Sequence, residues 1–458
     1  MKRRVVRIMA VLAALMTAFS IFSVSAGEMR YEFPADEGTD IMAPSAMMMY
    51  VGVKADQDVV LYEKQADTRY QPGGLMRVAM IGYAMKRIKE KRLNMDEVHG
   101  TYTLEMFNHY VAGTGLHVAM MNFGETWTVR DLLTVCTIQT AADCAVVLAT
   151  AIEGSVETFV TGLNNFAREL GCTNSAFTNV TCLNEEGQYM SARDVMMFTR
   201  YAMEYPELRG MLELTQYTVT PVSGGKKRSW PTGNDMLRAS TPYYYTYATG
   251  GKTGGTLTET SLVTFGGKDG YEYLAVVMGA PRKDEKGELT GMAYADARRL
   301  IRWGLIGFTY QMIARKNEPV GRINVLDCAD YDSISLVPSK EFFTVVGNDV
   351  DLTKLTRRIV CESDTLTAPV KAGDKVGTLE IYLENNLIGT VPLAAGQSAD
   401  YHMLYALWRR VSAAVFSWWT LGILAILVLA AAGYAVLNVQ YNKKRKRKSR
   451  KTTQKAKR

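Results

Sequence analysis

An uncharged apolar stretch near the C-terminus constrains what this chain can fold into more than any other feature. Residues 411–437 contain no Asp, Glu, Lys or Arg. A helix needs about 20 consecutive apolar residues to cross the hydrocarbon core of a bilayer, and this stretch exceeds that length. Aromatic residues of the kind found at membrane interfaces lie near its two ends: Trp408, Trp418, Trp419, Tyr434 and Tyr441. The sequence therefore predicts one transmembrane helix over residues 411–437.

Basic segments at both ends of the chain predict its orientation. Residues 438–458 hold eleven lysines and arginines and no acidic residue. Such segments stay on the cytoplasmic side, so we predict a basic cytoplasmic tail and an extracytoplasmic main body. Residues 1–26 agree with this orientation, because a basic start, an apolar run and the small residues Val24-Ser25-Ala26 are typical of a signal peptide. The alternatives are an uncleaved N-terminal anchor and a tail that binds anionic lipid or nucleic acid.

The charge and cysteine content of the central part narrow its function. Subtracting the +11 of the tail and the +4 of the N-terminal segment from the formal net charge of +7 leaves −8. An acidic body without a basic stripe argues against nucleic acid as a partner. For the basic tail, the predicted contact is the cytoplasmic membrane. Six cysteines in an exported region permit disulfides, with Cys172–Cys182 and Cys328–Cys361 as plausible local pairs. No cysteine or histidine spacing suggests zinc, so we predict neither metal nor cofactor.

The periodicity of the chain, which has 458 residues, divides the exported part into two folded regions. Over residues 41–310, strand-like segments lie at both ends and helical segments in the middle. This order predicts an α+β domain in which helices cover an antiparallel sheet, with a helical subdomain. Residues 318–395 alternate between apolar and polar positions without a helical period, and this pattern predicts a small all-β domain.

Several segments share their order and spacing with one enzyme family. They are Val60-Leu61-Tyr62-Glu63-Lys64, Gly113-Thr114-Gly115, Ser191-Ala192-Arg193-Asp194, Lys252-Thr253-Gly254-Gly255-Thr256, Val276-Val277-Met278-Gly279-Ala280-Pro281 and Ala368-Pro369-Val370-Lys371. Through them the exported region resembles the serine D-alanyl-D-alanine carboxypeptidases, the low-molecular-mass penicillin-binding proteins. The resemblance implies a transpeptidase/β-lactamase-like fold and a substrate in the stem peptide of peptidoglycan.

The resemblance also exposes gaps in the catalytic motifs, which in this family are S-x-x-K, S-x-N and K-T-G. The first motif falls after Tyr70-Gln71-Pro72, where Gly74 replaces the nucleophilic serine and Arg77 replaces the lysine. Glycine has no nucleophilic atom, and arginine, with a pKa above about 12, does not act as a base in proteins. In the second motif Thr140 keeps a hydroxyl and Ala142 loses the amide of asparagine. We therefore predict a degenerate active site at Gly74, Arg77, Thr140 and Ala142.

The third motif is intact and predicts substrate binding by Lys252, Thr253, Gly254, Gly255 and Thr256. Lys252 and Thr253 can hold a terminal carboxylate through charge-assisted hydrogen bonds. The backbone N–H groups of Gly74 and Gly255 can still form an oxyanion hole, because that role needs no side chain. The alternative is that the triplet is a vestige retained by strand pairing.

Other segments offer substitutes for the lost nucleophile. The segment Ser223-Gly224-Gly225-Lys226 matches S-x-x-K but falls in a predicted hairpin, whereas the motif requires the start of a helix. Thr232-Gly233-Asn234 imitates S-x-N in a similar loop, and Cys144 is a nucleophile by chemistry alone.

Three functional hypotheses follow from these motifs. The first is a membrane-anchored pseudoenzyme that binds peptidoglycan stem peptides or cell-wall proteins. The second is an active carboxypeptidase with an unusual nucleophile, and the third is an interaction module in which the old pocket is irrelevant.

Overall fold

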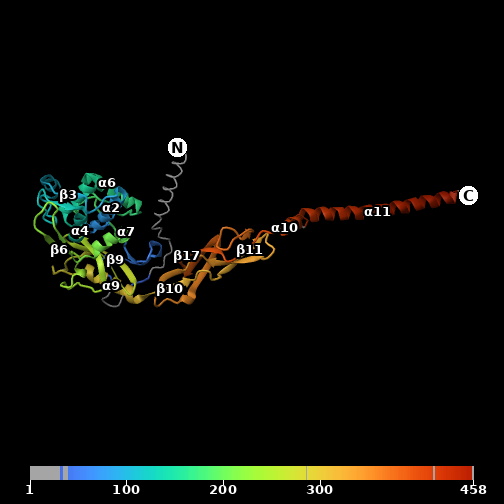
Figure 1. Cartoon of the computed structure of the whole chain (residues 1–458). Coiled ribbons are helices and arrows are strands. Elements are labelled where there is room, and N and C mark those ends of the chain that lie inside the picture. Colours follow the sequence, from blue (N-terminus) through green and yellow to red (C-terminus); the bar gives the residue numbers. More distant parts are fainter. Residues whose placement is uncertain (1–30, 35–39, 285, 416–417, 456–458) are drawn as a thin grey trace, which may run out of the picture. The chain divides into compact units, whose positions relative to one another are not determined.

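The structure is a computed structural model that describes residues 31–34, 40–284, 286–415 and 418–455. The predicted signal peptide, residues 1–26, lies outside the described residues. The chain divides into two compact units (Figure 1). The first comprises Met1–Gln311, Phe343–Leu355 and Leu383–Ile388, and the second comprises Met312–Phe342, Thr356–Tyr382 and Gly389–Arg458.

An antiparallel five-stranded sheet forms the centre of the first unit, with the strand order β2-β1-β9-β8-β7. Its strands are β1 (Ser45–Tyr50), β2 (Val59–Lys64), β7 (Ala248–Gly255), β8 (Glu259–Lys268) and β9 (Tyr271–Pro281). The N-terminal strands β1 and β2 thus lie in the same sheet as β7, β8 and β9, joined through the pairing of β1 with β9. This agrees with the predicted α+β arrangement. The K-T-G triplet lies on β7, at one edge of the sheet.

Both faces of this sheet are buried, because alternate residues of a strand point to opposite faces. On β1, Met47 and Met49 belong to one hydrophobic core, whereas Ala46, Met48 and Tyr50 belong to a second core. The first core holds the helices between β2 and β7, and the second holds α9 (Met292–Gly307). The predicted sheet covered by helices is confirmed.

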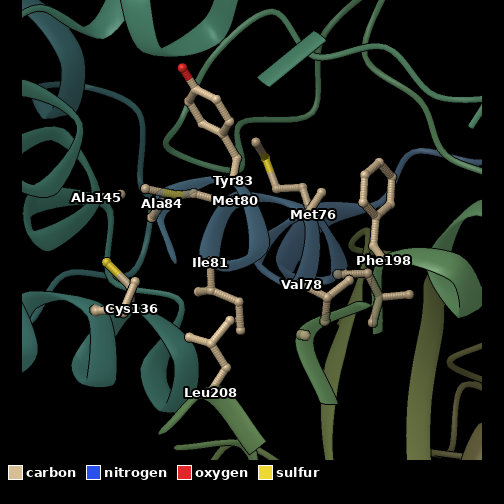
Figure 2. Packing of buried hydrophobic residues seen from close by; sticks show 14 of the residues in the cluster. Met76, Val78, Met80, Ile81, Tyr83, Ala84, Cys136, Ala145, Phe198 and Leu208 are labelled. Carbon is tan, nitrogen blue, oxygen red and sulfur yellow. The ribbon is translucent and has the colours of Figure 1, made fainter. Parts of the chain in front are cut away.

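Helix α2 (Met76–Lys91) runs through the middle of the first core and is buried along most of its length. Figure 2 shows that its side chains project in several directions: Met76 lies towards Phe198, Ile81 towards Leu208, and Tyr83 points away from both. A helix packed on several sides has little freedom to shift. The residues at its start, which include Gly74 and Arg77, are therefore held firmly.

The remaining elements of the first unit build the predicted helical subdomain and its connections. Its helices are α3 (Leu104–Met106), α4 (Val129–Gln139), α5 (Ala142–Glu153), α6 (Val156–Glu169), α7 (Ala192–Met203) and α8 (Pro206–Glu213). Short helical turns are η1 (Ala55–Gln57), η2 (Gly73–Leu75), η3 (Phe107–Val111) and η4 (Asp235–Leu237). Two small antiparallel pairs are formed by β3 (His99–Thr101) with β4 (Thr126–Thr128) and by β5 (Gln216–Val219) with β6 (Arg228–Pro231).

Within the part of the domain that is predicted to be helical, a break at Thr140 separates α4 from α5. Thr140, which ends α4, has a φ of 61°. A β-branched residue rarely adopts this left-handed conformation, so the break is an imposed feature of the fold. The break brings the backbone carbonyls of Thr140 and Ala141 to face the start of α2.

The second unit contains a six-stranded sheet with the order β14-β16-β17-β12-β11-β15. Its strands are β11 (Gly321–Leu326), β12 (Ser333–Pro338), β14 (Leu355–Cys361), β15 (Thr365–Thr367), β16 (Lys375–Leu383) and β17 (Asn386–Ala395). A separate two-stranded sheet consists of β10 (Phe308–Ala314) and β13 (Phe342–Gly347), and the turn η5 (Leu352–Lys354) precedes β14. The predicted all-β character of this region is confirmed.

The C-terminal helices follow the β domain within the second unit. Helix α10 (Met403–Val415) is joined to that domain because Arg409 Nε donates to Asp327 Oδ1 over 2.7 Å and the N–H of His402 donates to the carbonyl of Asp327 over 2.8 Å. Helix α11 (Trp418–Lys455) contains a segment, Gly422–Arg445, that is long and apolar enough to cross a membrane, with a mean hydropathy of 2.2. This segment overlaps most of the predicted span.

Candidate active site

The K-T-G strand meets the start of α2 through a joint between two glycine pairs. Gly73 and Gly74 form the turn η2 before the helix, and Gly254 and Gly255 end β7. The N–H of Gly255 donates to the carbonyl of Pro72 over 3.1 Å. The two walls of the predicted catalytic cleft are thus hydrogen-bonded backbone to backbone, and we call this contact the glycine joint.

Asn184 closes the same joint from the side. Its Oδ1 accepts from the N–H of Gly73 over 3.1 Å, and its Nδ2 donates to the carbonyl of Gly255 over 3.1 Å. Asn184 lies in an irregular loop that matches no catalytic motif, so sequence patterns gave no signal for it. Its amide can satisfy one group from each wall at once, since it carries both a donor and an acceptor.

The glycine joint leaves no room for a side chain at the position of the nucleophile. A Cβ atom on Gly74 would lie 2.6 Å from the carbonyl oxygen of Thr253 and 3.0 Å from Oγ1 of Thr140. A Cβ on Gly254 would lie 2.4 Å from the backbone nitrogen of Leu75. The missing side chains are therefore what allows these two backbones to approach so closely.

Arg77 occupies the interior below this joint and is fully buried. One guanidinium nitrogen donates to Met80 Sδ over 2.9 Å and to the carbonyl of Val180, and the other donates to the carbonyls of Ala141 over 3.2 Å and Thr140 over 3.4 Å. Within the described residues no carboxylate forms an ion pair with it, and its Nε has no hydrogen-bond partner. Arg77 thus links α2 to the break between α4 and α5 as a structural donor.

The side chains of Thr140 and Lys252 form a direct hydrogen bond between two of the predicted site motifs. The Nζ of Lys252 donates to Oγ1 of Thr140 over 2.6 Å. Lys252 is only 3% exposed, and burial lowers its pKa to about 7, with a smaller contribution from the positive charge of Arg77. This pair brings a hydroxyl and an amine with a lowered pKa together, but the nearest position for a nucleophile, Gly74, has no side chain.

The other predicted site residues lie around this pair. Ala142 begins α5 and is buried, and its N–H donates to the carbonyl of His117 over 2.8 Å. The hydroxyl of Thr253 donates to the carbonyl of Gly233 over 3.1 Å, so the Thr232-Gly233-Asn234 loop lies against the K-T-G strand. Thr256, at the outer end of the strand, accepts from the N–H of Glu259 through its hydroxyl over 3.1 Å.

The predicted oxyanion hole is not available in this structure. Its two donors were to be the N–H groups of Gly74 and Gly255, but the N–H of Gly255 is used by Pro72 in the glycine joint. An oxyanion hole requires donors aimed at the position of the developing charge. One of the two expected donors is thus already hydrogen-bonded, because two glycine pairs without side chains allow the walls to approach each other.

The substitute nucleophiles have no catalytic surroundings. Ser223 lies in the loop between β5 and β6 rather than in the first turn of a helix, and its Oγ accepts from the N–H of Thr126 over 3.1 Å. Cys144 is buried, and burial raises the pKa of its thiol well above the usual value. All six cysteines are free in the structure, so neither local pair, Cys172–Cys182 nor Cys328–Cys361, forms a disulfide here.

We expect the lowered pKa of Lys252 to make stability depend on pH. Between about pH 7 and pH 10 the lysine of the unfolded chain binds a proton that the buried lysine has lost. The unfolded state then holds more protons, so the free energy of unfolding should rise with pH across this window. Denaturant titrations at pH 7, 8 and 9 measure the slope, and the slope should become smaller in Lys252→Met. A slope in Lys252→Met equal to that of the parent chain would show that the pH dependence of stability does not come from Lys252.

A hollow of about 520 Å³ opens beside the glycine joint, at the outer end of the K-T-G strand. It is lined by Arg69, Tyr70, Gln71, Asn184, Thr256, Leu257, Thr258 and Glu259. It thus carries one basic and one acidic side chain, together with Leu257, whose side chain is almost completely exposed. Its size suits a small ligand or a short peptide end.

Comparison with known proteins places this fold and site in a family. A family model described as D-alanyl-D-alanine carboxypeptidase matches residues 33–282, which is more than half of the chain. The chain belongs to this family. A second model, described as the C-terminal domain of penicillin-binding protein 5, matches residues 308–400, so the family resemblance extends through the β domain.

Relatives and solved structures agree with the family assignment. The D-alanyl-D-alanine carboxypeptidase DacF of Bacillus subtilis is 24% identical over 75% of this chain and 83% of its own length. DacD of Escherichia coli is 26% identical over 73% of this chain and 82% of its own length. The fold is similar to that of penicillin-binding protein 5 from Haemophilus influenzae, with a TM-score of 0.63 and 20% identity over 80% of this chain and all of that one.

Proposed function

We propose that this member of the D-alanyl-D-alanine carboxypeptidase family does not hydrolyse peptides and acts by binding at the outer face of the cell membrane. The glycine joint is the observation that carries the proposal. It joins the two walls of the cleft, uses the N–H of Gly255 and leaves no room for a side chain at position 74. Three requirements of acyl transfer, namely a nucleophile, a free oxyanion donor and space for the acyl group, are thus missing together.

The loss of the base supports the same proposal. Arg77 is buried and uses its guanidinium as a hydrogen-bond donor to the carbonyls of Val180 and Ala141, and a guanidinium offers no acceptor. Lys252 is the one remaining amine of the motifs, and its contact is with Thr140 rather than with position 74. In a protease whose catalytic groups act as a unit, loss of the nucleophile alone lowers turnover by roughly a million-fold.

The ligand we propose is a peptidoglycan stem peptide or a cell-wall protein, bound at the hollow beside the glycine joint. This hollow is open to solvent, whereas Lys252 is almost fully buried. Arg69 can receive a carboxylate and Glu259 an amino group of a peptide. The position at the end of the K-T-G strand lets the protein keep the family's binding edge without its chemistry.

Membrane attachment follows from α11 and the basic residues behind it. The apolar residues of α11 before position 438 anchor the chain, and we propose that the tail of residues 438–458 lies in the cytoplasm and the two folded domains outside. In this orientation the hollow faces the compartment that contains peptidoglycan.

Incubation of the detergent-solubilised full chain with a fluorescent penicillin and with a D-Ala-D-Ala pentapeptide tests the proposal. We expect no increase in intact mass and no release of D-alanine, with the Bacillus subtilis DacF relative treated in parallel as the positive control. Calorimetry with the same pentapeptide should then detect binding that weakens in Arg69→Gln but not in Lys283→Gln, an exposed residue outside the hollow.

The outcomes separate the three hypotheses. Release of D-alanine, or a penicillin adduct on any residue, would refute the absence of chemistry. No turnover combined with no pentapeptide binding would favour the pure interaction module. In that case Lys252→Ala should leave the cellular phenotype unchanged.

A further inference from the structure

A second hollow lies on the opposite side of the sheet from the first core, against α9. Its volume is about 420 Å³, and its lining includes Tyr245, Tyr247, Tyr271, Lys268, Arg298 and Arg302. We call it the tyrosine–arginine pocket. It shares no lining residue with the hollow beside the glycine joint, and α9 belongs to the second core, whereas α2 belongs to the first.

Tyrosine rings form the base of this pocket. The rings of Tyr245 and Tyr247 pack edge to face with centroids 5.5 Å apart, and Tyr271 follows from the start of β9. Tyr245 is largely buried, and burial raises the pKa of its hydroxyl, so the group stays a neutral hydrogen-bond donor. Such a base offers apolar ring faces together with hydroxyl groups.

Three cations from two elements surround the rings. The guanidinium of Arg298 lies 5.2 Å from the centroid of the Tyr245 ring, and the ammonium of Lys268 lies 5.9 Å from that of Tyr247. Arg302 is one helical turn after Arg298 on α9, so both side chains leave the same face of the helix. The cations are therefore directed to one place from the helix and from the β8–β9 hairpin.

These cations are weakly neutralised by the protein itself. Among the described residues, Arg298 and Arg302 form no ion pair, and Lys268 has only Asp269 at 3.8 Å, with both side chains exposed. The body of the chain between the N-terminal segment and the tail carries a net charge of −8. The pocket, with three cations and one carboxylate, is therefore a positively charged site on an acidic body. An anion would complete the charge balance of the pocket.

We propose that the tyrosine–arginine pocket binds a phosphate group carried on a small polyol or sugar. Two arginines one turn apart can grip the oxygens of a phosphate with several parallel hydrogen bonds, which lysine alone does poorly. The tyrosine faces can lie against the carbon skeleton, and their hydroxyls can bond to its hydroxyl groups. An envelope polymer with phosphodiester links and a phospholipid headgroup both present this chemistry.

Titration of the full chain in neutral detergent micelles with glycerol 3-phosphate and with a short glycerol phosphate oligomer tests the proposal. Calorimetry should show binding that is at least ten-fold weaker in the double variant Arg298→Gln, Arg302→Gln. The matched control is Lys283→Gln, Lys286→Gln, which removes the same charge from exposed positions outside the pocket. The basic tail also attracts phosphate and is present in both double variants. The contribution of the pocket is therefore measured by the difference in affinity between them.

Further arms define the ligand and its source. Tyr247→Ala should weaken oligomer binding more than Tyr247→Phe, and inorganic phosphate should bind more weakly than the oligomer. If the arginine variant loses binding only to phosphatidylglycerol vesicles and not to the oligomer, the phosphate comes from a lipid. Equal binding by both double variants to the oligomer and to the vesicles alike, or inorganic phosphate binding as tightly as the oligomer, would overturn the proposal. Thermal melting confirms folding, and pentapeptide binding at the other hollow should be unchanged in all variants.

Discussion

A serine placed at position 74 is expected to destabilise the fold by about 1–3 kcal/mol and to leave the protein without a penicillin adduct. The added Cβ would lie 2.6 Å from the carbonyl oxygen of Thr253, and this backbone atom cannot move aside as the end of a flexible side chain can. Relief of the clash requires β7 to separate from the start of α2. The glycine joint would then open at the expense of its hydrogen bonds, and thermal melting together with intact mass measures both consequences.

Gly210→Ser is the matched control for this substitution. Gly210 lies on the exposed side of α8, and a Cβ there would meet no heavy atom within 4 Å. The control should therefore melt at or slightly above the temperature of the parent chain. Penicillin acylation of Gly74→Ser without loss of stability would show that the cleft opens easily. The triple variant Gly74→Ser, Arg77→Lys, Ala142→Asn should also lose stability and form no adduct, because its other two changes leave the clash at position 74 in place. Acylation of this variant without loss of stability would likewise show that the cleft opens easily.

Removal of the buried guanidinium is expected to have a larger effect on stability. Arg77→Ala should cost about 3–5 kcal/mol, because it leaves a cavity at the centre of the first core and leaves the carbonyls of Val180 and Ala141 without their donor. Denaturant unfolding at neutral pH measures the loss.

Arg77→Met separates packing from charge. Methionine keeps most of the volume, so this variant should lose clearly less stability than Arg77→Ala. It also removes a positive charge near Lys252, and the pKa of that lysine should rise towards its ordinary value. In Arg77→Met, the rise of the free energy of unfolding with pH should therefore begin at a higher pH than in the parent chain. Equal losses in the two variants, with no shift of the pH profile, would show that Arg77 acts through its hydrogen bonds alone.

Much of the fold follows from local sequence patterns. The strand-like and helical segments of residues 41–310 and the apolar C-terminal segment predict elements that are present. The break at Thr140 was not predictable, because threonine has no preference for a positive φ and the conformation is held by distant groups. Those groups are Lys252, bonded to the hydroxyl, and Arg77, directed at the carbonyl.

The candidate site was only partly predictable for a related reason. The replaced residues at positions 74, 77 and 142 can be found by motif spacing, since each motif sits on one local element. The glycine joint depends on two segments about 180 residues apart in sequence and on Asn184, which belongs to neither. Sequence spacing can therefore locate missing groups, but it does not show that the space they would occupy has been filled by backbone.

The glycine joint also has an evolutionary consequence. A catalytic residue lost by substitution alone can return by a single reverse mutation, because the space it occupied stays open. Here the main chain of β7 occupies that space, and a returning serine would be selected against for instability before it could be selected for activity. Under the proposed function, the change from hydrolase to binding protein contains a step that is hard to reverse. Descendants of this chain are free to diversify the surrounding surface while the old chemistry stays inaccessible.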